Sequence, residues 1–171
     1  VPPGGQVRYP PATSDLHHEI ELVVALKGGG ADVPPAQALS LVYGYAVGLD
    51  LTRRDLQNAA KAKGHPWDAA KGFDASAPIS AIRKWDGAPP QGRIALCVNG
   101  QLRQQGQVAD MIWTLAEVIA EASKLWTLAP GDLIFTGTPE GVGPIVPGDL
   151  VEGEVEGVGQ LKFTVSAGDA S

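Results

Sequence analysis

Two glutamates two positions apart, Glu19 and Glu21, have the clearest capacity for chemistry in this sequence. They interrupt an apolar run, and in an extended strand residues i and i+2 point to the same face. Two carboxylates on one face repel each other unless a cation neutralises them, and carboxylate oxygens suit magnesium, manganese or calcium. The alternative, a solvated face of an antiparallel strand, is the commoner explanation of an isolated Glu-x-Glu, so the cation site is a hypothesis that other residues must support.

A third acid and a glycine-rich loop add to this hypothesis. Asp50 follows a second apolar run and precedes a predicted helix, which is a common place for a ligand or a catalytic group. Residues 135–143 combine glycines, a proline and two threonine hydroxyls directly after a predicted strand. Such a loop can present backbone N–H groups and hydroxyls to an anionic ligand, although it lacks the P-loop pattern.

The composition predicts one globular domain. The chain has 171 residues, of which 44% are hydrophobic and 19% charged, and its mean hydropathy is +0.00. No apolar run approaches the roughly 20 residues of a bilayer helix, and no secretion signal is visible, so we expect no membrane partner. A net charge of −6 without a long Lys/Arg cluster argues against nucleic acid. The single cysteine, Cys97, lies in an apolar run and is expected to be buried, which suits a cytoplasmic protein.

The elements that must position the acids are mostly strands. The sequence predicts strands over residues 19–26, 42–49, 93–98, 101–103, 133–135, 150–155 and 161–165. Asn99-Gly100 favours a type I′ hairpin turn between the third and fourth of these. Two glycines within 42–49 indicate a close approach of another chain segment or a bulge.

Three helices are predicted from apolar periodicity and capping residues. The first covers residues 34–41, and the second covers 51–61 with Thr52 as its N-cap and Asp55 in its first turn. The third covers 111–123, with Asp110 as its cap and with Met111 and Trp113 in the core. Residues 77–92 are predicted to form a surface excursion.

The order of several motifs in this sequence resembles that of a known family. Five motifs occur in the order seen in the fumarylacetoacetate hydrolase superfamily, and within it the chain is most similar to the bacterial fumarylpyruvate hydrolases of gentisate breakdown. The motifs are residues 17–21 (HHEIE), 48–57 (GLDLTRRDLQ), 71–74 (KGFD), 98–104 (VNG followed by RQ), and 130–132 (PGD) with 136–143 (TGTPEGVG). Five motifs in order are far more specific than any one of them.

The resemblance implies a fold and a cofactor. It implies an α+β fold with the mixed β-roll of the family's C-terminal domain, mostly β with a few short helices, over residues 1–171 as a single catalytic domain. It also implies a homodimer and a bound Mg²⁺ or Mn²⁺ ion. The family's metal ligands map onto Glu19, Glu21 and Asp50, which agrees with the spacing of the two glutamates.

The resemblance also implies a reaction. A metal-dependent hydrolase would cleave the C–C bond of a 2,4-diketo acid, converting fumarylpyruvate to fumarate and pyruvate. Lys71 matches the lysine beside the metal, where it would act in catalysis and hold substrate charge, and Gln57 and Thr138 match substrate-contacting positions. Arg54 and Asp55 would support the Asp50 loop. His18 could support the acids, but a structural or exposed histidine is an equal alternative.

One part of the family pattern has no counterpart here. Family members carry an upstream Gly-Arg-Asn-Tyr segment with a His and a Glu that activate water, often on a mobile lid. The three histidines, His17, His18 and His65, lie outside such a context, so no general base is identified in this chain. Because the chain starts abruptly at Val1, we expect that a lid segment precedes it.

The same residues are compatible with other functions. The same metal site could serve an oxaloacetate decarboxylase or acylpyruvase, or a hydroxymuconate-type isomerase or decarboxylase, because all act on 2-oxo acids. The alternative without catalysis is a metal-binding relative that has lost activity, or a β domain with a purely structural ion.

Overall fold

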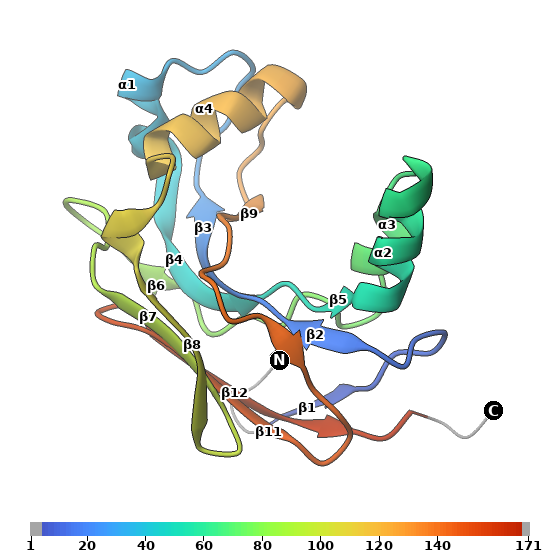
Figure 1. The fold of residues 1–171 in the computed structure, drawn as a ribbon. Coiled ribbons are helices and arrows are strands. Elements are labelled where there is room, and N and C mark those ends of the chain that lie inside the picture. Colours follow the sequence, from blue (N-terminus) through green and yellow to red (C-terminus); the bar gives the residue numbers. More distant parts are fainter. Residues whose placement is uncertain (1–4, 169–171) are drawn as a thin grey trace.

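Strands are the commonest regular elements of the computed structural model, which describes residues 5–168. They form a five-stranded sheet in the order β1-β12-β11-β7-β8, a three-stranded sheet in the order β10-β2-β5 and a four-stranded sheet in the order β6-β4-β3-β9. Helices are few and short (Figure 1). The predicted α+β fold, mostly β, is therefore confirmed, while the lid segment expected upstream of Val1 lies outside the described residues.

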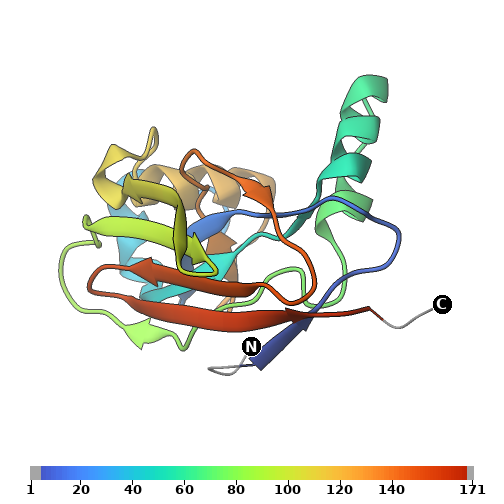
Figure 2. The same cartoon turned by 60° about the horizontal axis from the view of Figure 1, so that its bottom comes forward.

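The five-stranded sheet forms one side of the molecule (Figure 2). Its strands are β1 (Gly5–Arg8), β12 (Gly159–Ser166), β11 (Leu150–Val155), β7 (Arg93–Val98) and β8 (Gln101–Gln107). All neighbours are antiparallel except β1 and β12. Asn99 and Gly100 both have positive φ, at 52° and 76°, as a type I′ turn requires, so the predicted hairpin is confirmed.

The four-stranded sheet carries the central strand of the molecule. Its members are β6 (Arg83–Lys84), β4 (Val42–Leu49), β3 (Ile20–Leu26) and β9 (Leu133–Phe135), and every residue of β3 is buried. The two glycines of β4 allow the close approach that the sequence indicated. A Cβ at Gly44 would lie 2.1 Å from the carbonyl oxygen of Arg83, and one at Gly48 would lie 2.5 Å from the side chain of Val23.

The small third sheet lies just before the strand predicted over residues 19–26, which the structure shows as β3 starting at Ile20. It contains β10 (Gly143–Pro144), β2 (Leu16–His18) and β5 (Thr52–Arg53). Glu19 lies at the break between β2 and β3, so the chain changes sheets there. The prediction of Thr52 as an N-cap is wrong, because Thr52 pairs with His17 across the β2–β5 ladder.

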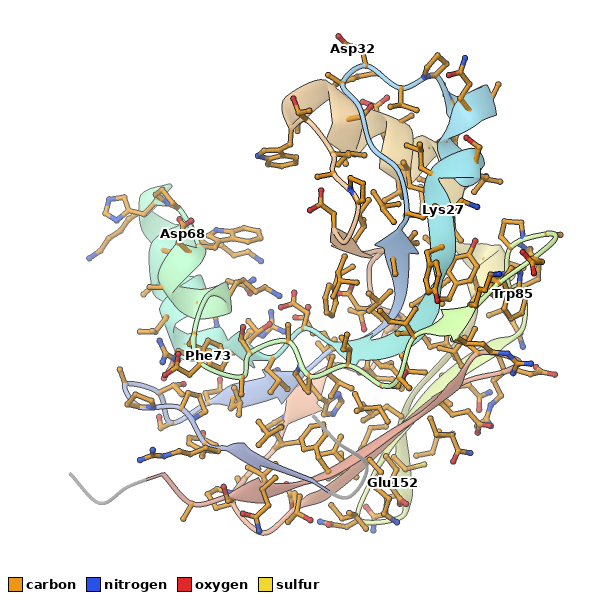
Figure 3. All side chains as sticks on the ribbon, turned by 180° about the vertical axis from the view of Figure 1, so that it is seen from behind. Lys27, Asp32, Asp68, Phe73, Trp85 and Glu152 are labelled. Atoms are coloured by element: carbon orange, nitrogen blue, oxygen red, sulfur yellow. The ribbon has the colours of Figure 1, made fainter. Side chains whose placement is uncertain are left out.

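The helices lie at two separate places. α1 (Pro35–Ala38), the 3-10 turn η1 (Leu39–Leu41) and α4 (Leu115–Leu125) lie together at one end, whereas α2 (Arg54–Lys63) and α3 (Asp68–Lys71) form a projecting arm (Figure 1). Figure 3 shows Asp68 and Phe73 on this arm, away from Lys27 and Asp32. None of the helices within residues 5–168 has the length and apolar character of a membrane span.

The helix predicted over 111–123 begins later than expected. Asp110 lies in a 3-10 turn, η2 (Val108–Asp110), and Thr114 caps α4 in a capping box with Glu117. The reciprocal bonds of Thr114 and Glu117 satisfy two helix N-terminal groups, which a cap at Asp110 does not achieve. Met111 packs partly against the core, but the prediction for Trp113 is wrong, since it precedes the helix and is 49% exposed. Cys97 is only partly buried.

Candidate metal centre

Three carboxylates converge at the point where β2, β3 and β4 meet. One carboxylate oxygen from each of Glu19, Glu21 and Asp50 lies within 4.8 Å of the others. The pairing of β3 with β4 places Ile20 opposite Leu49, and the N–H of Asp50 then donates to the carbonyl oxygen of Glu19 at 2.9 Å. The register of one antiparallel pair therefore brings the third acid to the other two.

Two cationic side chains reach the same cluster from the projecting arm. Arg54, the first residue of α2, donates to Glu19 through Nη2, and Lys71, the last residue of α3, donates to Glu19 Oε2 at 3.0 Å. Lys71 Nζ also bonds to Asp50 and, at 2.7 Å, to Thr52 Oγ1. Arg53, at the end of β5, donates to the carbonyl oxygen of Ala69 in α3 at 3.1 Å. This bond helps to hold α3, and with it Lys71, beside β5.

The three acids have unequal affinities for protons. Burial works to raise the pKa of Glu19, but hydrogen bonds from Lys71 and Arg54 outweigh it and lower the pKa. Burial raises the pKa of Asp50, with partial compensation from Lys71. Glu21 has no such cationic bond: burial and the nearby charges of Asp50 and Glu19 raise its pKa to about 7, although a backbone N–H opposes them.

This donor set fits a hard divalent cation. All three groups are carboxylates, the ligands that magnesium and manganese prefer, and they are close enough to bind one ion together. The ammonium of Lys71 already bridges Glu19 and Asp50, which shows that positive charge is favoured between them. Glu21 is buried with a raised pKa, and a bound cation would remove the repulsion that raises it.

The glycine-rich loop lies directly on the acids. Thr136 Oγ1 donates to the carbonyl oxygen of Leu22 at 2.8 Å, and the N–H of Gly137 donates to Glu21 Oε2 at 2.7 Å. Gly137 has a φ of 103°, a conformation that glycine adopts without strain. The loop does bind an anion through its backbone, as its composition indicated, but that anion is a carboxylate of the protein itself.

Gln57 and Asp55 both lie on α2, but Gln57 is buried and Asp55 bonds to a segment that is distant in the sequence. Gln57 is 3% exposed, and its Oε1 accepts a hydrogen bond from Arg54 Nη1 at 2.5 Å. Asp55 accepts from Thr13 Oγ1 at 2.7 Å and from the N–H of Ser14 at 3.1 Å. Neither Arg54 nor Asp55 bonds directly to Asp50: Arg54 donates to Glu19 and Gln57, and Asp55 accepts from residues 13–14.

The two histidines beside the acids are both engaged. His17 Nε2 lies 2.9 Å from Asp15 Oδ1, and its Nδ1 receives a hydrogen bond from Arg54 Nε at 3.4 Å. His18 is 1% exposed, and its Nδ1 bonds to Gln104 Oε1 at 2.8 Å. Burial lowers the pKa of His18, against the effect of its bond to Gln104. His18 therefore has the structural character that the sequence left as one alternative.

Gln104 belongs to one of the five family motifs, but the motif alone predicts no role for it. It is the one fully buried position of β8, whose sequence QLRQQGQ has a single large apolar residue, Leu102, which is 52% exposed. Its amide nitrogen donates to Thr138 Oγ1 at 2.9 Å. The single large apolar residue of this strand points outward, so the hydrophobic pattern does not indicate which glutamine turns inward, and the remaining signal was the Arg103-Gln104 motif.

A cavity of about 530 Å³ opens beside the loop. It is lined by Leu22 of β3, by the loop including Gly137 and Thr138, and by a segment that includes Met111 and Trp113. None of the three acids lines the cavity, and its link to the acidic cluster is Gly137, whose N–H donates to Glu21. A second hollow is lined by residues 65–68 and by Lys71, which bonds to two of the acids.

Comparisons with known proteins agree with this geometry. The family model described as "Fumarylacetoacetate (FAA) hydrolase C-terminal" matches residues 1–166. A fumarylpyruvate hydrolase of Ralstonia sp. is 49% identical over 166 residues, which are 96% of this chain and 86% of the relative. A mitochondrial oxaloacetate tautomerase of Mus musculus is 45% identical over 167 residues, covering 96% of this chain and 76% of the relative.

One similar solved structure contains ligands. It is the crystal structure of a fumarylpyruvate hydrolase from Pseudomonas aeruginosa in complex with Mn²⁺ and pyruvate. Its TM-score to this chain is 0.94 and its sequence identity is 43%, over 98% of this chain and 74% of that one.

Proposed function

Because the chain belongs to the fumarylacetoacetate hydrolase family, through its C-terminal domain type, we propose that it is a metal-dependent hydrolase that cleaves a C–C bond of a 2,4-diketo acid. The proposed substrate is fumarylpyruvate, which yields fumarate and pyruvate in the breakdown of gentisate. The observation that carries the proposal is the convergence of Glu19, Glu21 and Asp50 within 4.8 Å beside a cavity of about 530 Å³. The similarity to fumarylpyruvate hydrolases supports the choice of substrate.

The three carboxylates are the proposed ligands of Mg²⁺ or Mn²⁺. A bound divalent ion supplies a Lewis acid that polarises the oxo groups of the substrate and stabilises the negative charge that develops on the departing pyruvate unit. The cationic side chains of Arg54 and Lys71 hold Glu19 in its ionised form through their hydrogen bonds. Glu19 is thereby ready to bind an ion at neutral pH, whereas Glu21, with a pKa of about 7, must still give up its proton.

Three further side chains are proposed to bind the substrate. Lys71 places an ammonium group beside the acids, where it would pair with substrate charge during catalysis. Gln57 has its oxygen engaged by Arg54, which leaves its amide nitrogen to donate to a substrate oxygen. Thr138 lines the cavity next to Gly137. All three roles follow from family motifs and suit the positions of these side chains.

The attacking water must lose a proton before the C–C bond can break. The water oxygen adds to the distal carbonyl carbon, the bond to the pyruvate unit then breaks, and the electron pair leaves with that unit and takes up a proton. His17 has both ring nitrogens engaged, by Asp15 and by Arg54. From the family pattern, in which an upstream His and Glu activate water, we propose that the base lies in the expected upstream lid.

The proposed assembly and location follow the family resemblance. We propose that residues 1–171 form one catalytic domain, that the protein is a homodimer, and that it acts in the cytoplasm. Sedimentation equilibrium of the purified protein tests the proposed homodimer directly, because a dimer has twice the monomer mass of 17.7 kDa. A monomer at all accessible concentrations contradicts the proposed dimer.

A second candidate is interconversion of the keto and enol forms of oxaloacetate. The 45% identity to an oxaloacetate tautomerase favours it, and the same carboxylate cluster could serve both reactions. The tautomerase reaction moves protons without hydrolysing a C–C bond, so it needs no attacking water. The two candidates therefore differ in whether pyruvate is released from a diketo acid.

The deciding experiment measures the ultraviolet absorption of fumarylpyruvate and of acetylpyruvate in the presence of the full-length protein. We expect a loss of absorption that requires Mg²⁺ or Mn²⁺ and stops when a chelator is added, with one pyruvate formed per substrate. A protein that leaves both compounds intact with either metal refutes the hydrolase proposal. Accelerated loss of enol-oxaloacetate under the same conditions then supports the tautomerase.

A further inference from the structure

Gln104 lies at the junction between the metal-binding strand and the glycine-rich loop. Its Oε1 accepts a hydrogen bond from the backbone N–H of Ile20 at 3.2 Å, and its Nε2 donates to the carbonyl oxygen of Pro139 at 2.8 Å. A backbone N–H can only donate and a carbonyl oxygen can only accept. These two partners therefore determine which way the amide of Gln104 points, independently of any choice between its two ends.

The orientation of this amide determines the role of Thr138. Gln104 Nε2 donates to Thr138 Oγ1 at 2.9 Å, so the threonine oxygen is an acceptor in that bond. A hydroxyl has only one proton, and it must then point in another direction. The Thr138 hydroxyl donates to no protein acceptor within residues 5–168, and the residue lines the cavity. Its proton is available to a ligand there.

The loop is also held in place by close packing. A Cβ at Gly141 would lie 2.3 Å from the carbonyl oxygen of Arg103, and one at Gly106 would lie 3.0 Å from Cβ of Pro139. These glycines let the loop lie directly on β8. At its other end Gly137 donates to Glu21 at 2.7 Å. Thr138 is thus held between β8 and the acidic cluster, with little freedom to turn its hydroxyl by moving the backbone.

We propose that Gln104 is a positioning residue that makes Thr138 a hydrogen-bond donor to the ligand in the cavity. The inference rests on the proposed function in one respect, namely that the ligand is a 2-oxo acid. The chemistry it recognises is an accepting oxygen, a carboxylate or a carbonyl, rather than an ammonium or a hydroxyl proton. His18 supports the arrangement by bonding to the same oxygen of Gln104 as Ile20 does.

The test reverses the polarity at one position. In Gln104→Glu, one carboxylate oxygen keeps the bonds to Ile20 and His18. The other faces Thr138, whose hydroxyl proton it accepts, and the carbonyl oxygen of Pro139, to which the bond from Nε2 is lost. The matched control is Gln101→Glu, which adds the same charge at an exposed position of the same strand. For each full-length variant, calorimetry measures the affinity of the Mn²⁺-loaded protein for pyruvate, and electron paramagnetic resonance measures the affinity for Mn²⁺ alone.

We expect Gln104→Glu to weaken pyruvate binding by about tenfold or more, the cost of losing a hydrogen bond to a charged group. Its Mn²⁺ affinity should stay within about threefold of the original, because no metal ligand has changed. Gln101→Glu should alter neither quantity. Pyruvate affinity that is unchanged in Gln104→Glu overturns the inference, as does an equal loss of both affinities, which indicates general damage to the site.

A double-mutant cycle with Thr138→Val separates polarity from packing. If Gln104 acts through the Thr138 proton, Gln104→Glu causes no further loss of pyruvate affinity in the Thr138→Val background. Additive losses overturn the inference. Should circular dichroism show that Gln104→Glu does not fold, Gln104→Met takes its place in the cycle, and the effect of Thr138→Val should then shrink; an undiminished effect contradicts the proposal.

These measurements do not depend on turnover. A protein that binds pyruvate with Mn²⁺ but cleaves no diketo acid refutes the proposed hydrolase function and leaves the inference about Gln104 intact. A protein whose Gln104→Glu variant binds pyruvate normally refutes the inference and leaves the hydrolase function intact.

Discussion

Metal binding to this protein should depend on pH mainly through Glu21. Burial and the neighbouring charges of Asp50 and Glu19 raise the pKa of Glu21 from 4.5 to about 7 in the metal-free protein. At about 1.36 kcal/mol per pH unit, this shift corresponds to roughly 3 kcal/mol of unfavourable free energy for the ionised form. A divalent ion requires that ionised form, so it must displace the Glu21 proton whenever the pH is below 7.

The expected result is proton release that varies with pH. With a pKa of about 7, Glu21 is about 0.9 protonated at pH 6 and about 0.1 protonated at pH 8, so Mn²⁺ binding should release close to one more proton at pH 6 than at pH 8. Asp50, whose pKa burial also raises, adds to the same direction, whereas Glu19 is already ionised. The apparent Mn²⁺ affinity should rise as the pH increases from 6 to 7 and level off above 8.

The assay is titration calorimetry of Mn²⁺ in pairs of buffers with different ionisation enthalpies, which counts the protons released. The control variant is Glu152→Gln, which removes an exposed carboxylate on β11 that bonds to Lys162 and should change nothing. Equal proton release at pH 6 and pH 8 refutes the reasoning, because it means that Glu21 does not hold a proton in the metal-free protein at pH 6.

The same shift predicts the stability of the metal-free protein. The folded pKa of Glu21 lies above the ordinary value of 4.5, so folding retains a proton that the unfolded chain loses between pH 4.5 and pH 7. The contribution is present below pH 4.5 and is lost as the pH rises through 7. Urea unfolding of the Glu21→Gln variant should therefore show a smaller decline of stability over this window than the original protein shows.

Three further predictions concern single side chains. Lys71→Met removes an ammonium that competes for two of the acids, so Mn²⁺ affinity measured by paramagnetic resonance should be unchanged or higher while turnover falls by about 100-fold or more; a loss of metal affinity contradicts this. Gly48→Ala places a methyl group 2.5 Å from the side chain of Val23, which should lower the free energy of unfolding by about 1–3 kcal/mol in urea; wild-type stability contradicts the packing argument. Thr114→Ala removes the cap of α4 and should cost about 1 kcal/mol in the same assay with turnover unaffected, whereas Thr114→Ser should retain the cap.

Local sequence patterns predicted much of the fold. Alternating or apolar runs bounded by turn residues predicted the strands that became β4, β7, β9, β11 and β12, and Asn99-Gly100 predicted the hairpin between β7 and β8. These features succeed because period-2 patterns and positive-φ turns depend on neighbouring residues alone. The predicted start of the helix over 111–123 was wrong, because the capping box of Thr114 and Glu117 is a better start signal than Asp110.

The sequence by itself determined the identities of the acids and the family to which the chain belongs, because motifs and their order are properties of the chain alone. Only the tertiary structure decided how those residues meet. The antiparallel register of β3 and β4 brings Asp50 to Glu19, and the folded arm brings Lys71 to both. Burial then makes Glu21 and Gln104 unlike other residues of their types, since desolvation and the direction of a hydrogen bond arise only when distant segments pack together.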